Sequence, residues 1–206
     1  MKKKIIGIID YGAGNLGSIY NAINYLGYEA KLLERPESIN KFSHIILPGV
    51  GSFGELSKNL KKKNWPLKIK IYLKKGNFLL GICAGMQLLF QESDESKGVK
   101  GLGLIKGKLQ MFKRSSNLPI PHVGFNEVNF TNSKIWNGIK NKSAFYFIHS
   151  YRITKNEENI KISTTTYGEK FISFVEKENI FGAQFHPEKS HFIGLRLLKN
   201  FIGLKN

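Results

Sequence analysis

The sequence has only one cysteine, Cys83, among its 206 residues. A single cysteine excludes an intramolecular disulfide and is typical of proteins from reducing compartments. No apolar run approaches the roughly 20 residues that a membrane-spanning helix needs. The lysine-rich start resembles a signal peptide only superficially, because its apolar stretch is shorter than the ~7–15 residues of a signal core and ends at Asp10. We therefore expect a soluble, cytoplasmic chain.

Acidic residues are also few, with 15 of them against 32 basic residues and a net charge of +17. Such an excess can indicate binding to nucleic acid. Only four of the basic residues are arginine, however, and the lysines are scattered over all segments. No helix-turn-helix, zinc module or aromatic RNA-binding strand is recognisable. The composition therefore favours a solvated surface and no nucleic-acid partner, with some of the charge available to complement an acidic protein.

Apolar runs and helical patterns alternate in the first half of the chain. Runs at 5–9, 30–33, 44–47 and 77–82 predict buried strands, and helical patterns are centred between and after them, at 15–26, 53–63, 65–75 and 84–92. Asn15 is a plausible cap for the first helix. This alternation predicts an α/β fold, with a mostly parallel central sheet flanked by helices. The length fits one domain over residues 1–206.

The second half of the chain has a different sequence pattern. Short strand-like pieces separated by turn signals predict antiparallel additions to the sheet, and the apolar pattern at 191–204 predicts a final packing helix. The predicted additional strands are 101–111, 126–130, 144–151, 161–166, 171–176 and 180–185.

Cys83 lies between a predicted strand and a predicted helix, in the sequence Gly81-Ile82-Cys83-Ala84-Gly85. This G-x-nucleophile-x-G pattern is typical of a sharp turn that lifts a nucleophile above the carboxyl ends of the strands. The small flanking residues allow close approach of substrate and backbone. A helix that starts at the cysteine would favour the thiolate. A lone cysteine is as often inert packing, so the rest of the chain has to decide.

A cysteine nucleophile needs a base, and the base needs an orienting group. His186 and Glu188 are two residues apart, so their side chains would share one face of an extended segment that Pro187 keeps from being helical. The pattern predicts a Cys-His-Glu triad. The alternatives are a purely structural pair, or a metal site with His191, which is disfavoured because no second Cys/His cluster exists.

A glycine-rich loop, Pro48-Gly49-Val50-Gly51, follows the strand at 44–47. Its glycines leave backbone N–H groups free to stabilise an oxyanion during acyl transfer. By itself the loop is more simply explained as a turn. Together with the Cys83 turn and the His-Pro-Glu segment it predicts acyl-transfer chemistry.

With these motifs the chain resembles the class I (triad-type) glutamine amidotransferases, whose fold is flavodoxin-like. More narrowly, it is similar to the glutaminase subunits of imidazole glycerol phosphate synthases. The resemblance covers nearly the whole chain and rests on six motifs in order: residues 8–18, 48–54, 81–89, 121–126, 146–151 and 184–190. In such proteins the cysteine attacks the side-chain amide of glutamine and expels ammonia, and water then releases glutamate from the thioester.

The resemblance implies a role for each matching position. Cys83 is the nucleophile, His186 the general acid/base and Glu188 its orienter, with no metal and no cofactor. Gly51 and the Ala84 amide match the oxyanion site. The positions that hold the amino-acid end of glutamine are Gln87, Glu95, Ser150 and Tyr151, and those at the partner interface or gate are Asn15, Tyr146 and Lys189.

The resemblance also implies a partner. Residues 1–206 leave no room for a domain that accepts ammonia, so a (β/α)8-barrel cyclase would form a heterodimer with this chain and make imidazole glycerol phosphate and AICAR in histidine biosynthesis. Two departures are small: Ala84 replaces a usual leucine and Phe125 a usual tryptophan.

Two alternatives stay open at this stage. One is a paralogous glutaminase that supplies a different synthase, such as one that modifies a surface sugar. The other is a non-catalytic regulatory subunit, against which the intact Cys83, His186 and Glu188 argue.

Overall fold

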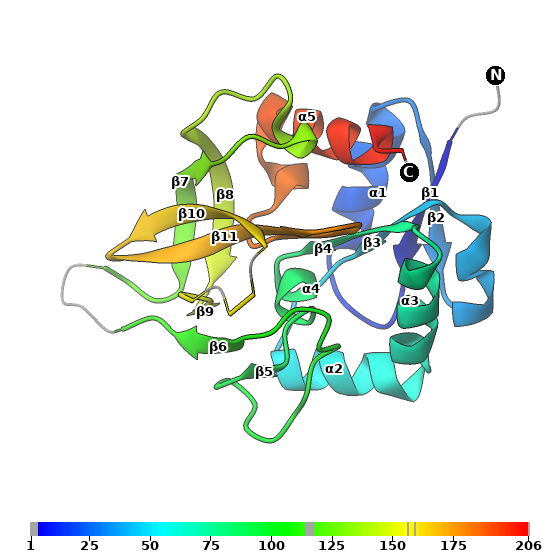
Figure 1. The fold of residues 1–206 in the computed structure, drawn as a ribbon, viewed down its shortest axis with the longest axis horizontal. Helices are drawn as coiled ribbons and strands as arrows, with labels where there is room; N and C mark the ends of the chain where they lie inside the picture. The colour runs from blue at the N-terminus through cyan, green and yellow to red at the C-terminus, as the bar shows by residue number, and fades with distance from the viewer. Residues whose placement is uncertain (1–3, 114–117, 156, 159, 206) are drawn as a thin grey trace.

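The computed structural model describes residues 4–113, 118–155, 157–158 and 160–205. Its main feature is a nine-stranded sheet in the order β2-β1-β3-β4-β12-β11-β10-β7-β8 (Figure 1). Five neighbouring strands are parallel, namely β2 (Glu29–Leu33), β1 (Ile5–Ile9), β3 (His44–Leu47), β4 (Phe78–Ile82) and β12 (Ile180–Ala183). The other four continue the sheet in antiparallel pairing, namely β11 (Glu169–Lys177), β10 (Lys161–Tyr167), β7 (His122–Phe130) and β8 (Ser143–His149).

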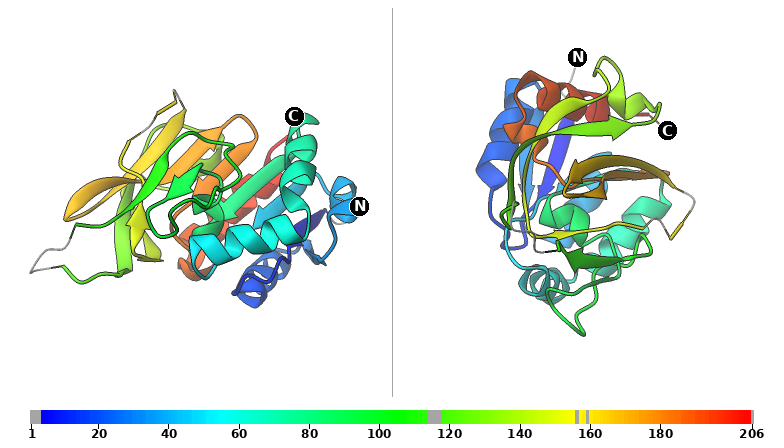
Figure 2. Two further views of the ribbon diagram at one scale, coloured as in Figure 1. Left: turned by 90° about the horizontal axis from the view of Figure 1, so that it is seen from below. Right: turned by 90° about the vertical axis from the view of Figure 1, so that its left-hand side faces the viewer.

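Helices cover both faces of the parallel half (Figures 1 and 2). Helices α1 (Leu16–Tyr25) and α5 (His191–Gly203) lie on one face, and α2 (Phe53–Lys62) and α3 (Trp65–Lys74) on the other. The predicted fold class is thereby confirmed, and the order of the five parallel strands is the flavodoxin-like one. The described residues also include three short 3₁₀ helices: η1 (Pro36–Lys41), η2 (Lys134–Trp136) and η3 (Pro187–Lys189).

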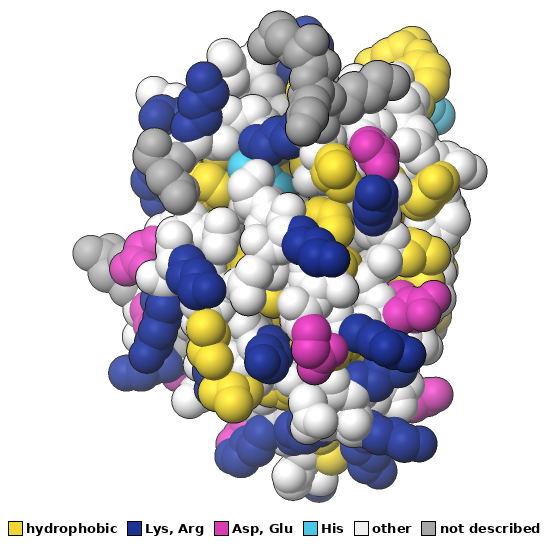
Figure 3. Space-filling view, turned by 90° about the vertical axis from the view of Figure 1, so that its right-hand side faces the viewer, with side chains coloured by type: hydrophobic (Ala, Val, Ile, Leu, Met, Phe, Trp, Pro, Cys, Tyr) yellow, Lys and Arg dark blue, Asp and Glu magenta, His cyan; other side chains and the backbone are white. Residues whose placement is uncertain are grey.

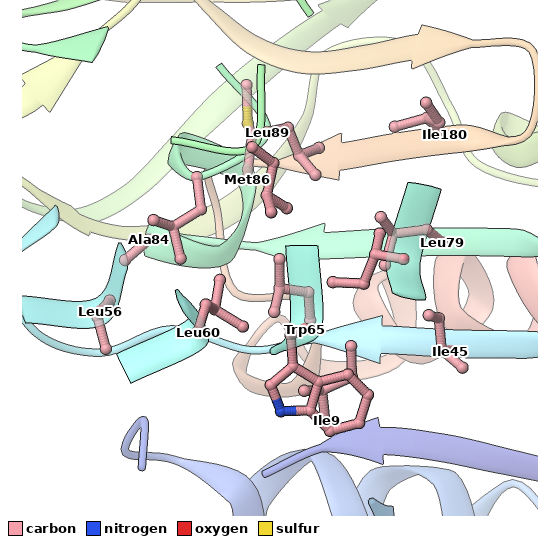
Figure 4. Packing of buried hydrophobic residues seen from close by; sticks show 14 of the residues in the cluster. Ile9, Ile45, Leu56, Leu60, Trp65, Leu79, Ala84, Met86, Leu89 and Ile180 are labelled. Atoms are coloured by element: carbon pink, nitrogen blue, oxygen red, sulfur yellow. The ribbon is translucent and has the colours of Figure 1, made fainter. Parts of the chain in front are cut away.

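The inner strands of the parallel half, β1, β3, β4 and β12, are apolar at successive positions because both of their faces are buried. On β3, Ile45 belongs to the hydrophobic cluster that α2 and α3 cover, whereas Ile46 belongs to the cluster that α1 and α5 cover. Trp65, at the start of α3, is wholly buried in the first cluster together with Ile9 and Leu79 (Figure 4). The two clusters hold the central strands between layers of helix.

The helix after Cys83 is much shorter than predicted. A pattern at 84–92 indicated a full helix, but α4 (Ala84–Gln87) is a single turn. The carbonyl of Leu88 accepts a hydrogen bond from the Leu102 N–H at 2.8 Å, and that of Leu89 accepts one from Leu104 at 2.9 Å. Because these distant N–H groups occupy the carbonyls, the helical hydrogen-bond pattern does not continue past this turn.

Strand β12 was predicted as one of the antiparallel additions, which is correct for its pairing with β11 and wrong for its pairing with β4. The hairpin at Glu178 and Asn179 reverses the chain, so β12 runs antiparallel to β11 and parallel to β4. It is therefore the last strand of the parallel set and joins the two halves of the sheet.

Two other predicted additions differ from the structure. Of residues 101–111, only β6 (Lys108–Met111) is a strand, in a separate small sheet with β5 (Glu92–Ser93) and β9 (Tyr151–Arg152). The stretch 144–151 divides at Ser150 into β8 and β9, because the chain leaves the main sheet there to pair with β6.

Lysine and arginine side chains are dispersed among acidic, polar and apolar ones on the face of the molecule shown in Figure 3. This distribution fits the prediction of a solvated basic surface. Within the described ranges, no helix has both the length and the apolar character needed to cross a membrane.

We predict that acid destabilises the fold partly through His44. The ring is 1% exposed and stacks on Phe78 with centroids 4.7 Å apart. Burial, with a smaller effect of Lys4, lowers the pKa of His44 to about 3. The unfolded chain, with a histidine pKa of about 6.5, therefore takes up a proton first, and stability is lost as the pH falls through 6.5 towards 3.

Between pH 7.5 and 5.5 this effect costs about 1.4 kcal/mol for one histidine. In urea unfolding at the two pH values, His44→Phe should therefore lose about 1.4 kcal/mol less stability than the unchanged chain. An equal pH dependence of both proteins would contradict the assignment.

Candidate active site

A cavity of about 230 Å³ lies beside the Cys83 turn, at the carboxyl ends of β3 and β4. This edge is where open α/β sheets generally bind ligands. The structure brings eight of the predicted residues together as lining of this one cavity: Gly51, Cys83, Ala84, Gln87, Glu95, Ser150, Tyr151 and His186. They come from segments far apart in the sequence. Glu188 contacts His186 but does not line the cavity.

The backbone at Cys83 has the geometry predicted for a nucleophile on a sharp turn. Its φ of 54° and ψ of −116° are unusual for a residue with a side chain. The Cys83 N–H donates to the Ala183 carbonyl at 2.7 Å, and the Cys83 carbonyl accepts from the Gln87 N–H at 3.1 Å. These bonds hold a strained residue in place, which is common at functional sites.

Cys83 is 7% exposed, and its sulfur has polar neighbours. Its thiol donates to the Ile148 carbonyl at 3.7 Å, and the Gln184 amide donates to Sγ at 3.8 Å. Since α4 has only one turn, the helix contributes less positive charge than the sequence suggested. The nearby imidazole of His186 is therefore the main group that can activate the sulfur.

His186 and Glu188 form the predicted pair, but not on an extended segment. Pro187 starts the 3₁₀ helix η3, and this turn brings His186 Nδ1 to 2.7 Å from Glu188 Oε1. The proline is compatible with the turn because the first position of a helix needs no N–H donor. The Glu188 side chain is 0% exposed, so it is shielded from water when it orients the ring.

Asn15 occupies the predicted N-cap position of α1, but its side chain does not cap the helix. Its backbone is left-handed, with φ of 68°, and its side chain makes no capping hydrogen bond. The side-chain amide instead donates to Glu188 Oε1 at 2.5 Å. Asn15 thus holds the carboxylate that bonds His186, and it connects the loop after β1 to the His186–Glu188 pair.

The environment of His186 favours its protonated form. Burial by itself lowers the pKa of His186, but the interactions with the Cys83 sulfur and the Glu188 carboxylate outweigh it and raise the pKa to about 10. Nδ1 is occupied by Glu188, whereas Nε2 has no hydrogen-bond partner of normal geometry among the described residues. Nε2 is therefore the atom available to exchange a proton with the sulfur or with a substrate.

The glycine-rich loop contacts the backbone of the Cys83 turn. A Cβ on Gly49 would lie 2.4 Å from the Gly85 nitrogen, so this glycine is required by close approach. Gly51 has a φ of +141°, where a side chain would be strained. Val50 between them is 49% exposed. The loop is therefore packed at Gly49 and open to solvent at Val50.

Two further cavity residues, Gln87 and Glu95, form hydrogen bonds with other parts of the protein. Gln87 Nε2 donates to the Tyr151 carbonyl at 3.2 Å and to Gln184 Oε1 at 3.0 Å. Glu95 Oε2 accepts from the Phe53 N–H at 2.7 Å, at the start of α2. Both side chains therefore stabilise the walls in addition to lining the cavity.

The two other predicted interface residues lie outside the cavity. The Lys189 ammonium is 5.9 Å from the centre of the Tyr146 ring, a cation–π distance. Phe125, which is 47% exposed, lies 5.4 Å from the same ring, centroid to centroid. The three side chains form a surface cluster next to the segment between β12 and η3, where the His186 N–H donates to the Tyr146 carbonyl at 2.8 Å.

The sequence interpretation missed Gln184. Its side chain is 1% exposed and bonds both the Cys83 sulfur and Gln87. The available signal was a glutamine within the otherwise apolar run 180–185, because a buried amide requires hydrogen-bond partners.

Comparison with known proteins gives consistent matches along the chain. The model of the family "Glutamine amidotransferase class-I" matches residues 7–203. A Helicobacter hepaticus protein named "Imidazole glycerol phosphate synthase subunit HisH" is 43% identical, over 99% of this chain and 100% of that protein. A Methanocaldococcus jannaschii protein of the same name is 46% identical, over 97% of this chain and 100% of that protein.

Solved structures share the fold at lower identity. The structure of PurLQS from Thermotoga maritima matches with a TM-score of 0.78 and 20% identity, over 98% of this chain and 99% of that one. A crystal structure of a glutamine amidotransferase matches with a TM-score of 0.76 and 19% identity, over 97% and 99% of the two chains.

The contact between the loop and the Cys83 turn yields a stability prediction. A Cβ on Gly85 would lie 1.9 Å from the Leu47 carbonyl oxygen. This oxygen belongs to the backbone, so it cannot move aside as a flexible side chain could. Gly85→Ala should therefore lower the free energy of unfolding by at least about 2 kcal/mol.

Gly17 in α1 is the matched control, because a Cβ there meets nothing within 4 Å. Gly17→Ala should be neutral or stabilise by up to about 1 kcal/mol through helix propensity. Urea denaturation of both variants tests the contact, and equal effects would refute it.

Proposed function

This chain belongs to the class I glutamine amidotransferase family, and we propose that it is the glutaminase subunit of an imidazole glycerol phosphate synthase. It hydrolyses glutamine to glutamate and ammonia. The ammonia passes to a HisF-like (β/α)8-barrel cyclase subunit, which makes imidazole glycerol phosphate and AICAR in histidine biosynthesis. The observation that carries the proposal is the meeting of Cys83, His186 and Glu188 beside one cavity, in a chain similar over its full length to HisH subunits.

The geometry supports thioester chemistry at Cys83. The sulfur attacks the carboxamide carbon of glutamine, and its proton resides on His186. The carbonyl oxygen becomes an oxyanion, for which the Ala84 N–H and the loop at Gly51 are the candidate donors. His186 then gives a proton to the amide nitrogen as the carbon–nitrogen bond breaks and ammonia leaves.

The second half of the reaction uses the same base. His186 takes a proton from water, the hydroxide adds to the thioester carbon, and collapse of the adduct releases glutamate and the thiol. Glu188 keeps Nδ1 of the imidazole hydrogen-bonded through both steps, so Nε2 performs each proton transfer. Glu95, Ser150 and Tyr151 line the cavity where the amino-acid end of the substrate binds.

The partner has its place at the face around the cavity mouth. The exposed Phe125 and Lys189 contact the ring of Tyr146, whose backbone carbonyl accepts a hydrogen bond from the His186 N–H. A cyclase docked there receives ammonia directly and contacts the loop at Val50, which is open to solvent. The complex is a cytoplasmic heterodimer whose overall reaction is that of a lyase. The full-length similarity to HisH subunits supports histidine biosynthesis over a paralogous pathway.

Replacing the nucleophile tests the proposed function. In the complex with the cyclase, Cys83→Ala should reduce glutamine-dependent synthesis by at least ~10³-fold, because covalent and acid–base catalysis are both lost. Synthesis from added ammonium salt should stay within ~2-fold of the unchanged complex, since the cyclase binds the acceptor. Glutamine-dependent turnover that persists in Cys83→Ala would rule out Cys83 as the nucleophile.

The roles within the pair can be separated. His186→Ala should be nearly as damaging as the loss of the thiol, because the base moves both protons. Glu188→Gln should cause a loss at least ~10-fold smaller, because the amide can still hold the ring. Steady-state glutaminase rates of the complexes measure both, and the reverse order of severity would show that the roles are assigned wrongly.

A further inference from the structure

A chain of buried polar groups runs from the antiparallel half of the sheet to the cavity. His122 on β7 lies opposite His149 on β8. His122 Nδ1 is 3.1 Å from His149 Nε2, and His149 Nδ1 is 2.8 Å from the Tyr151 carbonyl oxygen. At the other end, His122 Nε2 is 2.7 Å from the side-chain oxygen position of Asn126. These hydrogen bonds link four groups in series, and the last of them, the Tyr151 carbonyl, belongs to a segment that lines the cavity.

The surroundings of the two histidines are aromatic. The His122 ring stacks between Tyr167 and Phe147, with centroids 4.0 and 4.9 Å away. Phe112 and Phe171 contact the His149 ring at 5.2 and 5.1 Å. His122 is 0% and His149 6% exposed. An unpaired ring nitrogen would be costly here, so every hydrogen bond in the chain matters.

In this series of hydrogen bonds, the donor and acceptor of each bond can be assigned. Burial lowers the pKa of His149 to about 3 and also lowers that of His122, so both rings are neutral and each has one donor and one acceptor. A carbonyl only accepts, so His149 Nδ1 carries the hydrogen and Nε2 accepts from His122 Nδ1. His122 Nε2 must then accept as well, which requires the interchangeable amide of Asn126 to present its nitrogen.

The Tyr151 carbonyl receives a second buried donor. Gln87 Nε2, from the distant helix α4, donates to the same oxygen at 3.2 Å. Two side-chain donors therefore fix the peptide that follows Tyr151. Within the same segment, the Ile148 carbonyl accepts from the Cys83 thiol at 3.7 Å, and Ser150 and Tyr151 line the cavity.

We propose that His149 is a positioning residue for substrate binding, and that His122 and Asn126 hold it in the required tautomer. Its Nδ1–H fixes the segment 148–151 in the conformation that receives the amino-acid end of glutamine. This inference rests on the proposed function. His149 does not exchange protons with the substrate, so its loss should affect binding of glutamine more than the chemical step.

Two substitutions of similar polarity separate this role from general stability. His149→Asn places an amide nitrogen near the position of Nδ1 and can still donate to the Tyr151 carbonyl. His149→Gln places it near Nε2, where it reaches His122 and not that carbonyl. His44→Asn and His44→Gln are matched controls, because His44 is also buried but, unlike His149, does not line the cavity.

The experiment measures KM and kcat for glutamine hydrolysis by the complex with the cyclase, and hydrogen exchange of the amides of residues 148–152 by mass spectrometry. His149→Gln should raise KM at least ~10-fold with kcat within ~3-fold, and should speed exchange in this segment. His149→Asn should stay within ~3-fold of the unchanged complex in KM, with exchange protected. Both His44 variants should change only the unfolding midpoint.

Equal KM and exchange in the Asn and Gln variants of His149 would overturn the proposal. If His149→Gln does not fold, His122→Gln and His122→Asn repeat the comparison one residue further from the cavity, with the same expected order. A protein without glutaminase activity in its unchanged form would refute the proposed function. The exchange measurement would still decide whether His149 positions the segment.

Discussion

The close contact between the backbone after β3 and the backbone of the Cys83 turn is the constraint on which the site depends. Gly85 has no room for a Cβ against the Leu47 carbonyl, and Gly49 has none against Gly85. The two segments therefore approach as closely as backbones can. This places the glycine-rich loop beside the Cys83 turn, so the proposed oxyanion donor and the proposed nucleophile share one cavity.

The parallel pairing of β4 and β12 has a similar consequence on the other side of Cys83. In this register Ala183 lies beside Ile82, and the Cys83 N–H continues the ladder to the Ala183 carbonyl. The chain leaves β12 three residues before His186, so the imidazole arrives on the side of the sulfur. An antiparallel β12 would have ended at the opposite edge of the sheet.

Buried polar side chains then orient the groups that the backbone brings to the cavity. Asn15 bonds the carboxylate of Glu188, which in turn bonds His186. On the opposite wall, Gln87 and His149 converge on the Tyr151 carbonyl. The Asn15–Glu188 and Gln87–Tyr151 bonds join segments that are distant in sequence, and the other two are local. All four are costly to break because their surroundings are largely buried. The site is thus rigid on both sides of the cavity.

Local sequence patterns were enough to predict the parallel α/β core, the sharp turn at Cys83 and the pairing of His186 with Glu188. These features follow from local patterns: apolar runs, glycines around one cysteine, and two polar residues beside a proline. The tertiary structure alone decided where α4 ends, which way β12 runs, and that Asn15 bonds Glu188 instead of capping α1. The physical reason is that each of these depends on hydrogen bonds between residues far apart in the chain, and no local pattern records such partners.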